Sequence, residues 1–405
     1  MHAPRPLSIS EAQARILARI RRGATEAVGL DAALGRILAA DVGASRDLPP
    51  FTNSAMDGYA VRSADTAAAS TSAPIYLDVI GVQAAGDIGS IGLAPGQAVA
   101  ITTGAPLPAG ADAVVRLEET DGGLEQVAIR VTVSAGAHIR HRGETLRAGA
   151  TILSAGTLLD PGQIALLAAL GDALPVVMRQ PRVAVLSTGN ELVPPGQSLD
   201  AAQTPDANGP MLAALIAQYG GITVPLGIAR DTPEEISRAL DTAGNADLII
   251  TTGGVSVGAY DAVRAVIAER GRLDFWQVAM RPGRPTAFGT IGQTPILALP
   301  GNPVAAFVAF HLLVRPAIAR MLGVTPETPP TVPVRLAHAI ANRGGHETYL
   351  RARIAETPTG REAHIAVDQG SGNIVGLASA TALVVIPEGI IALDAGEIVQ
   401  AILLS

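Results

Sequence analysis

The chain has 405 residues, of which 48% are hydrophobic, 16% are charged and only 3% are aromatic. One hydrophobic core rarely serves so long a chain, so we expect roughly two to four domains with aliphatic cores. The net charge of −7, without a basic block, argues against nucleic-acid binding. There is no Cys, and all 29 basic residues are Arg. Disulfides, thiolate metal sites, Schiff-base chemistry and a Walker lysine are therefore excluded.

The N-terminus predicts a helix rather than a signal peptide. Residues 8–22 begin with a capping box at Ser8 and Glu11, and apolar residues follow at helical spacing. No uninterrupted apolar run reaches the roughly 18 residues of a membrane span. The longest candidate, residues 296–314, is broken by a Pro-Gly-Asn-Pro turn. We therefore expect a soluble, cytoplasmic protein that does not contact a membrane.

The first half of the chain predicts a helical domain interrupted by a β-rich one. Residues 47–149 contain short apolar or alternating runs between Gly and Pro clusters, which is typical of a small β-rich domain. Residues 1–46 are helical in pattern. We expect them to form one N-terminal domain with residues 150–180, through packing of the apolar stretch 161–170 on the N-terminal helix. The β-rich domain would then be an insertion into the first domain.

The second half predicts an α/β domain followed by a small β domain. Within residues 181–328, the apolar runs at 183–186, 222–228 and 248–251 alternate with predicted helices. This βαβαβα order predicts a three-layer fold, a parallel sheet with helices on both faces. Residues 329–405 return to short strand-like runs, which favour a small β-barrel or sandwich.

Polar residues gather where the strands of the predicted α/β domain end. Glu191, Asp231 and Asp261 follow three successive strands, so each should lie at the carboxyl edge of the sheet, where such sheets bind ligands. The Gly-rich segment 251–258 follows the third strand and can cradle an anion through its N–H groups. Carboxylates beside a phosphate favour a bridging Mg²⁺.

This pattern predicts a Mg²⁺-assisted site for a phosphorylated small molecule, but each of its parts also has a purely structural explanation. Gly after a strand is usually a turn, and an acidic residue in a first helical turn is usually a cap. The Gly-rich segment fits neither the dinucleotide fingerprint nor a P-loop, so the ligand is not named by this pattern.

Further segments carry weaker signals. Arg281 and Arg284 lie in a stiff Arg-Pro-Gly-Arg-Pro turn that suits bidentate anion binding or is simply solvated. Residues 299–303, Leu-Pro-Gly-Asn-Pro, are consistent with a plain strand-to-helix turn. His138 and His141 have an H-x-x-H spacing, but no third metal ligand is near in sequence.

Taken together, these segments resemble the molybdopterin molybdenumtransferase family, which includes the C-terminal domain of gephyrin. The matching motifs occur in the family's order along essentially the whole chain. They are PPFTNSAMDGYA at 49–60, TGAP at 103–106, STGNEL at 187–192, GGVSVG at 253–258, RPGRP at 281–285 and LPGNPV at 299–304.

The resemblance implies an elongated homodimer of four-domain subunits. Its active site would lie between the α/β domain of one subunit and the second domain of its partner. The substrates would be adenylylated molybdopterin and molybdate, with AMP as a product and Mg²⁺ or another divalent cation as cofactor. A molybdopterin adenylyltransferase is a candidate partner.

The resemblance also assigns residues. The acidic active-site positions are Asp57, Glu191, Asp231 and Asp261, of which the first three would hold the metal. Expected substrate contacts are Thr103, Arg140, Ser187, Thr188, Gly189, Gly253, Gly254, Ser256, Gly258, Arg281, Arg284, Pro300, Pro303, Arg351 and Ser371.

The chain departs from the family pattern at two positions. Thr145 and Ala259 stand where acidic residues are expected. Their presence could leave the metal site with fewer carboxylate ligands or alter the preference between molybdate and tungstate. Two rival functions stay open: a non-enzymatic molybdopterin-binding or scaffold protein of the gephyrin type, and a pterin or nucleotide hydrolase that shares only the α/β domain.

Overall fold

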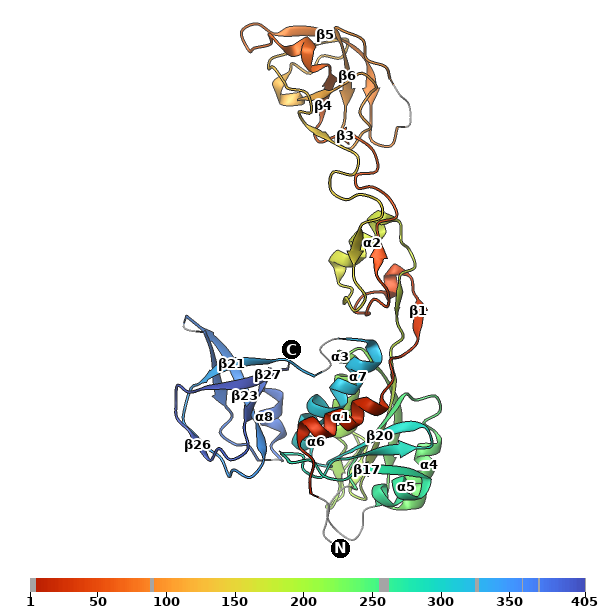
Figure 1. Cartoon of the computed structure of the whole chain (residues 1–405), viewed down its shortest axis with the longest axis vertical. Coiled ribbons are helices and arrows are strands. Elements are labelled where there is room, and N and C mark those ends of the chain that lie inside the picture. The colour runs from red at the N-terminus through yellow and green to blue at the C-terminus, as the bar shows by residue number, and fades with distance from the viewer. Residues whose placement is uncertain are drawn as a thin grey trace.

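The protein is elongated and has four lobes (Figure 1). The structure, a computed structural model, describes residues 5–87, 91–254, 262–324, 328–358, 360–370 and 372–404. A β-rich lobe with β3 to β6 lies at one end of the long axis, and the α/β domain lies at the other. A small lobe with α2 separates them, and the C-terminal barrel lies beside the α/β domain.

The α/β domain is built on a six-stranded sheet with the order β15-β12-β16-β20-β19-β17. The first four strands run parallel, and β19 runs antiparallel to both of its neighbours, β20 and β17. Because β12 lies between β15 and β16, the order in which the chain fills the sheet reverses beside β12, and sheets of this kind bind ligands at the carboxyl ends beside such a reversal. The strands are β12 (Arg182–Thr188), β15 (Ile222–Ala229), β16 (Leu248–Thr252), β17 (Gly271–Phe275), β19 (Ala287–Ile291) and β20 (Thr294–Leu299).

Alternating apolar side chains on these strands build two cores, one on each face of the sheet. One core includes Val183 and Val185, and the other includes Ala184 and Leu186. The predicted three-layer α/β fold is therefore confirmed. Helices α1 (Ile9–Arg19), α3 (Asn208–Gln218), α6 (Pro303–Ala309) and α7 (Arg315–Leu322) cover the first face, and α4 (Pro233–Asp241) and α5 (Ala262–Arg270) cover the second.

The N-terminal helix packs on a partner that the sequence did not predict. The capping box of Ser8 and Glu11 is present, but α1 buries Ala12 and Ile16 in the α/β domain, where it contacts α7 and the π-helical segment η4 (Phe310–Val314). The expected packing of residues 161–170 on this helix is wrong. The spacing of apolar residues fixes which face of a helix is buried, but it does not say which apolar surface receives it.

The helix α2 (Pro161–Leu170) belongs to the small middle lobe. Its Leu167 lies in a separate core with Leu38, Leu159 and Val177. Two-stranded pairings complete this lobe, β1 (Thr25–Ala27) with β11 (Val176–Met178) and β2 (Val42–Gly43) with β10 (Thr151–Leu153). The division of the chain at residues 46/47, 149/150, 180/181 and 328/329 stays a prediction.

The distal lobe is β-rich, as expected. Its five-stranded sheet has the order β7-β4-β6-β5-β8, and a short pair, β3 and β9, lies beside it. The strands are β3 (Asn53–Ser54), β4 (Gly58–Val61), β5 (Ile75–Gln83), β6 (Gln97–Ile101), β7 (Ala113–Arg116), β8 (Gln126–Ile129) and β9 (Ile139–Arg140).

The C-terminal region is a closed barrel, so the barrel alternative is the one confirmed. The strands run in the order β23-β24-β21-β27-β25, and β25 pairs back onto β23 to close the ring. A parallel pairing of β18 with β23 joins the barrel to the α/β domain. The strands are β18 (Met280–Arg281), β21 (Thr331–Leu336), β23 (Glu347–Thr357), β24 (Gly360–Ile365), β25 (Ala382–Ile386) and β27 (Ile398–Leu403).

One helix in the described part of the chain is long and apolar enough to cross a membrane. It runs continuously through α6, η4 and α7 from Pro303 to Leu322, and 78% of its most apolar window is buried inside the protein. Its apolar character is accounted for by its packing in the core of the α/β domain.

Candidate functional site

Four loops meet at the carboxyl edge of the sheet. The register pairs Thr188 at the end of β12 with Ala229 at the end of β15, and Thr252 at the end of β16 with Leu299 at the end of β20. The loops that follow therefore emerge side by side. They carry Gly189 and Glu191, Asp231, Gly253 and Gly254, and Pro300 to Pro303.

The glycines of this edge are required by close approach of the backbone. Gly253 has φ +88°, and a Cβ atom there would lie 2.2 Å from the carbonyl oxygen of Thr188. Gly254 has φ +59°, and its Cβ would lie 3.2 Å from Thr188 Oγ1 and 3.7 Å from Asp231 Oδ1. Gly301 approaches Gly253 from the other side, since its Cβ would lie 3.2 Å from the Gly253 Cα. Only small residues allow these loops to converge.

Several buried polar atoms at this edge have no hydrogen-bond partner among the described residues. They are Ser187 Oγ, Thr188 Oγ1, Thr251 Oγ1, Thr252 Oγ1, Asn208 Oδ1 and Asp231 Oδ1. Buried polar groups are rarely left unpaired, because each one loses its hydrogen bonds to water without replacement. Such a concentration beside the crevice of an α/β sheet is the pattern expected of groups that pair with a ligand.

The loop after β12 links Glu191 and Asp231, two acidic residues of this edge. Asn190 Oδ1 accepts a hydrogen bond from the backbone N–H of Asp231 at 3.3 Å. The Glu191 carboxylate folds back on its own loop, with oxygens 2.8 and 2.9 Å from the position of a Cβ on Gly189. Glu191 is exposed and Asp231 is half-buried. The predicted convergence of these two carboxylates on one edge agrees with this geometry.

Two further residues of the edge escaped the sequence analysis. Asp206 Oδ1 accepts from the backbone N–H groups of Asn208 and Gly209, both at 3.0 Å, and so caps the start of α3. Asn208 Nδ2 donates to the Gly301 carbonyl at 2.8 Å and ties α3 to the loop after β20. An Asp followed two residues later by Asn-Gly ahead of an apolar run is a helix-start signal that could have located both.

A second polar cluster lies in the distal lobe. Asp57 sits between β3 and β4, and its Oδ1 accepts from the Thr103 backbone N–H at 2.6 Å and from Thr103 Oγ1 at 2.9 Å. These hydrogen bonds hold the pKa of the Asp57 carboxyl below its ordinary value, so it stays ionised. Arg140 is exposed and pairs with Asn53 across β9 and β3, in the same corner of the lobe.

Close packing fixes this corner. A Cβ on Gly58, the residue after Asp57, would lie 1.9 Å from the carbonyl oxygen of Val115, so only glycine fits there. The backbone of Ser54 also pairs with the loop that carries Thr103, through Gly104 N–H to Ser54 O at 2.8 Å. The two loops are therefore held at a fixed separation.

The Arg281 turn lies between the α/β domain and the barrel. Gly283 packs beside the first turn of α6, and a Cβ on it would lie 3.6 Å from the Ala305 carbonyl oxygen. The turn therefore borders the carboxyl edge of the sheet, where α6 begins. Arg281 and Arg284 are both exposed, and Arg284 Nη2 donates to Gln277 Oε1 at 3.3 Å.

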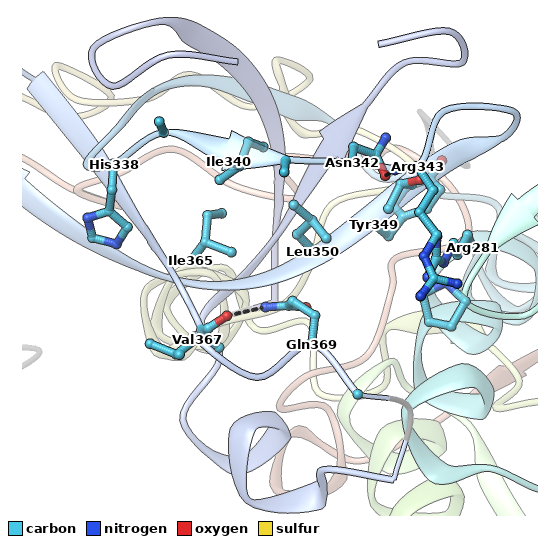
Figure 2. A pocket seen from close by; sticks show the side chains of 16 residues that line it. Arg281, His338, Ile340, Asn342, Arg343, Tyr349, Leu350, Ile365, Val367 and Gln369 are labelled. Atoms are coloured by element: carbon cyan, nitrogen blue, oxygen red, sulfur yellow. Dashed lines mark hydrogen bonds between the residues drawn. The ribbon is translucent and has the colours of Figure 1, made fainter. Parts of the chain in front are cut away.

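Beside this turn is a cavity of about 730 Å³ whose other walls come from the barrel (Figure 2). Arg281, Arg343 and Tyr349 stand at one end of it, and His338 stands at the other. Among the predicted site residues only Arg281 lines this cavity. The carboxyl edge is the better candidate for the chemistry, because the carboxylates and the unpaired polar atoms are there.

Arg351 does not face a cleft. Its side chain is 1% exposed, and its guanidinium donates to the carbonyl oxygens of Asp368 and Gly370, each at 3.0 Å, and to that of Asn373. The guanidinium thus holds the segment 368–373 in place. Ser371 is within that segment but lies outside the described residues.

Some predicted residues cannot be placed. Ser256, Gly258, Ala259 and Asp261 lie outside the described residues. In the described part of the chain, three or more His, Cys, Asp or Glu side chains nowhere gather as a metal site, and this includes the surroundings of His138 and His141. Asp57 is in the distal lobe and Glu191 and Asp231 are in the α/β domain, so a single chain does not bring the three proposed metal ligands together (Figure 1).

Three regions of the chain match family models from molybdopterin metabolism. Residues 7–171 match the MoeA N-terminal region (domain I and II), residues 184–320 match a probable molybdopterin binding domain, and residues 333–404 match the MoeA C-terminal region (domain IV). The crystal structure of the molybdopterin biosynthesis MoeA protein from Pyrococcus horikoshii is 33% identical, with a TM-score of 0.85 over 99% of this chain and 100% of that one.

Two curated relatives that span nearly the whole chain are molybdopterin molybdenumtransferases. Molybdopterin molybdenumtransferase 2 of Mycobacterium tuberculosis is 40% identical over 97% of this chain and 98% of its own length. The molybdopterin molybdenumtransferase of Nostoc sp. is 39% identical over 92% of this chain and 87% of its own. The chain therefore belongs to the molybdopterin molybdenumtransferase family, a family of transferases in molybdenum cofactor biosynthesis, and the resemblance seen in the sequence is confirmed.

Proposed function

We propose that the protein transfers molybdenum from molybdate to adenylylated molybdopterin and releases AMP, giving the molybdenum cofactor. The observation that carries the proposal is the set of unpaired buried polar atoms at the carboxyl edge, around Thr188, Asp231 and Thr252. These atoms lie where an α/β sheet reverses its strand order, which is where such sheets bind nucleotide-like ligands. Membership of the family gives the ligand its chemical class.

The phosphate groups of the substrate would lie over the loop that begins at Gly253. Gly253 and Gly254, the described residues of this loop, carry no side chains and pass close to Thr188. The hydroxyls of Ser187 and Thr188 would donate to the same ligand, since they have no other partner in the described residues. Arg281 and Arg284, at the border of the same edge, would hold the oxyanion end through their guanidinium groups.

The donor set also fits a hard divalent cation such as Mg²⁺. Glu191 and Asp231 offer carboxylate oxygens at the edge, and Asp231 Oδ1 is buried without a partner among the described residues. A cation bound there would neutralise charge on the phosphoanhydride and on the molybdate. The fully ionised Asp57 would complete this donor set from the distal lobe.

A second copy of the chain would bring Asp57 to the edge. Within one chain the middle lobe separates the two halves of the site (Figure 1). An arrangement in which the distal lobe of one subunit reaches the α/β domain of another would place Asp57, Thr103 and Arg140 over the crevice. We therefore propose a homodimer, and light scattering that finds a monomer at all working concentrations would contradict this part.

In this proposal neither Arg351 nor Thr145 contacts the substrate or the cation directly. Arg351 acts as a positioning residue for the segment that bears Ser371, because its own donors are used. The backbone N–H of Thr145 donates to the Leu48 carbonyl at 3.0 Å. Its neutral side chain adds no carboxylate to the cation site.

The test follows AMP release and cofactor formation together. Purified protein is mixed with adenylylated molybdopterin, Mg²⁺ and molybdate. We expect AMP release that requires molybdate and the cation, together with active cofactor. Release of AMP without molybdate would favour the hydrolase, and binding of the ligand without release would favour the scaffold. Neither rival is favoured by the relatives that span the chain.

We place the protein in the cytoplasm, where a molybdopterin adenylyltransferase would supply its substrate. A labile adenylylated intermediate is best passed directly between enzymes, so this partner is a reasonable one to test by co-purification. The choice between molybdate and tungstate is tested in the same assay by exchanging the oxyanion.

A further inference from the structure

A second cavity, of about 590 Å³, lies at the opposite edge of the sheet from the candidate site. Pro181, Asp247 and Pro295 line it, and each stands at the amino-terminal end of a parallel strand, β12, β16 or β20. Its volume is in the range of small-molecule sites. Nothing in the proposed transfer reaction uses this edge of the sheet.

The lining of this cavity is strongly basic. Arg19, Arg21, Arg22 and Arg179 contribute four positive charges, and Asp247 contributes one negative charge, in a chain whose net charge is −7. Arg19 is also paired with Asp274 at 3.7 Å, so the excess positive charge comes from Arg21 and Arg22. The last carbonyls of α1, which ends at Arg19, add partial negative charge but do not cancel these two formal charges.

The Asp247 carboxylate, the acidic group in the lining, already pairs with other groups of the protein. Asp247 Oδ1 binds Arg179 Nη2 at 2.7 Å, and its Oδ2 accepts from the Arg182 backbone N–H at 2.7 Å. Arg21 has no hydrogen bond or ion pair within the described ranges. Arg22 donates only one long hydrogen bond, at 3.4 Å, to a backbone carbonyl. The positive charge of Arg21 and Arg22 is therefore available to a ligand.

The walls are fixed by the two connectors that join the α/β domain to the middle lobe. Residues 20–24 leave α1 and residues 179–181 return to β12, and the Arg179 backbone N–H donates to the Ala24 carbonyl at 2.8 Å. The Gly23 N–H donates to the Met321 carbonyl at 2.8 Å and anchors the outgoing connector to α7. The cavity thus has a defined shape before any ligand binds.

The guanidinium of Arg22 is also placed by the backbone. Its Nε lies 2.8 Å from the position that a Cβ on Gly323 would take, so the group lies flat on the turn that ends α7. A guanidinium held in this way loses little freedom when it binds an anion.

We propose that this cavity binds a small molecule that carries at least two linked phosphate groups. Guanidinium groups pair with phosphate oxygens through two parallel hydrogen bonds, and several separate Arg side chains favour an extended polyanion over a single small one. The ligand would contact both connectors at once and would restrict the angle between the α/β domain and the middle lobe. The binding itself does not depend on the proposed transfer reaction.

Isothermal titration calorimetry on the full-length chain tests the binding with inorganic pyrophosphate and with ADP, at low and at high salt. We expect both probes to bind, more weakly at high salt. Tighter binding of ADP would indicate an organic phosphate, and equal binding would indicate that only the diphosphate is recognised. Hydrogen exchange at residues 20–24 and 179–181 should slow when the probe is bound.

Three variants locate the site. Arg21→Glu should weaken binding at least about tenfold, because it removes one unpaired positive charge and adds a negative one. Arg353→Glu, an exposed site on the barrel, is the matched control and should bind as the parent does. Absence of binding to the parent chain, or unchanged binding by Arg21→Glu, would overturn the proposal. Loss of binding in Arg284→Gln instead would assign the probe to the candidate functional site and would also overturn it.

Discussion

Replacement of Gly253 by Ala is the sharpest test of the geometry at the carboxyl edge. Gly253 has φ +88°, where an L-residue costs about 1–2 kcal/mol. In addition, the new Cβ would lie 2.2 Å from the Thr188 carbonyl oxygen. Thr188 cannot move away easily, because it is the last residue of β12 and its register with β15 is fixed. Such an overlap costs a further ~1–3 kcal/mol. We therefore expect the free energy of unfolding of the α/β domain to fall by about 2–5 kcal/mol in all.

The single tryptophan makes this loss measurable in the right domain. Trp276 packs on the core between the sheet and α4 and α5, so its fluorescence reports unfolding of the α/β domain within a multidomain chain. With a urea m-value of ~2 kcal/mol/M, the midpoint should fall by roughly 1–2.5 M.

A matched control separates the two costs. Gly292 also has positive φ, +55°, but no atom lies within 4 Å of the position of its Cβ. Gly292→Ala should therefore lower the free energy of unfolding only by the backbone cost of about 1–2 kcal/mol, with a correspondingly small shift of the midpoint. If Gly253→Ala lowers the midpoint no more than Gly292→Ala, the argument from close approach is refuted.

Three further predictions concern single side chains. Asp57→Asn should reduce molybdate-dependent AMP release at least ~100-fold while the circular dichroism spectrum is unchanged, because an amide oxygen can keep both hydrogen bonds from Thr103, which go to Oδ1 alone; full activity would remove the charge of Asp57 from the mechanism. Arg351→Met should destabilise the barrel by ~3–5 kcal/mol and speed hydrogen exchange around residues 368–373, since buried carbonyls lose a charged donor; unchanged exchange would contradict the positioning role. Burial lowers the pKa of His311 to about 3, so its imidazole stays neutral in the folded protein but takes up a proton below pH ~6.5 when unfolded, and stability falls as the pH falls. The free energy of unfolding should therefore decrease by ~2 kcal/mol less between pH 7 and pH 5 in His311→Leu than in the parent chain. An unaltered pH profile would show that another group causes the decrease.

Local order was largely predictable from the sequence. The Ser8 and Glu11 capping box occurs as expected, and the predicted strand at residues 248–251 is found as β16 (Leu248–Thr252). Each depends on residues within a few positions of one another, so a local pattern carries the information. The placement of Glu191 and Asp231 at one edge follows from the same order, because parallel strands bring their carboxyl ends together.

Contacts between distant segments could not be predicted in this way. The burial of Ala12 and Ile16 against residues 303–322 depends on which apolar surfaces match in shape, and the spacing of apolar residues is silent on that. The saturation of Arg351 by three carbonyls is equally hidden, since an Arg that binds a ligand and one that binds backbone look the same in sequence.

The family, the alternation of strands and helices, and the residue types that can hold an anion or a cation follow from the amino-acid sequence, because short motifs carry them. Which of those residues share a surface depends on the packing of distant segments and is seen only in the folded chain. It separates Asp57 from Asp231 within one chain, and it gathers Arg21, Arg22 and Arg179 around a cavity on the far edge of the sheet. Both outcomes depend on how the lobes are joined, because the two connectors that join them are far apart in the sequence and meet only in the folded chain.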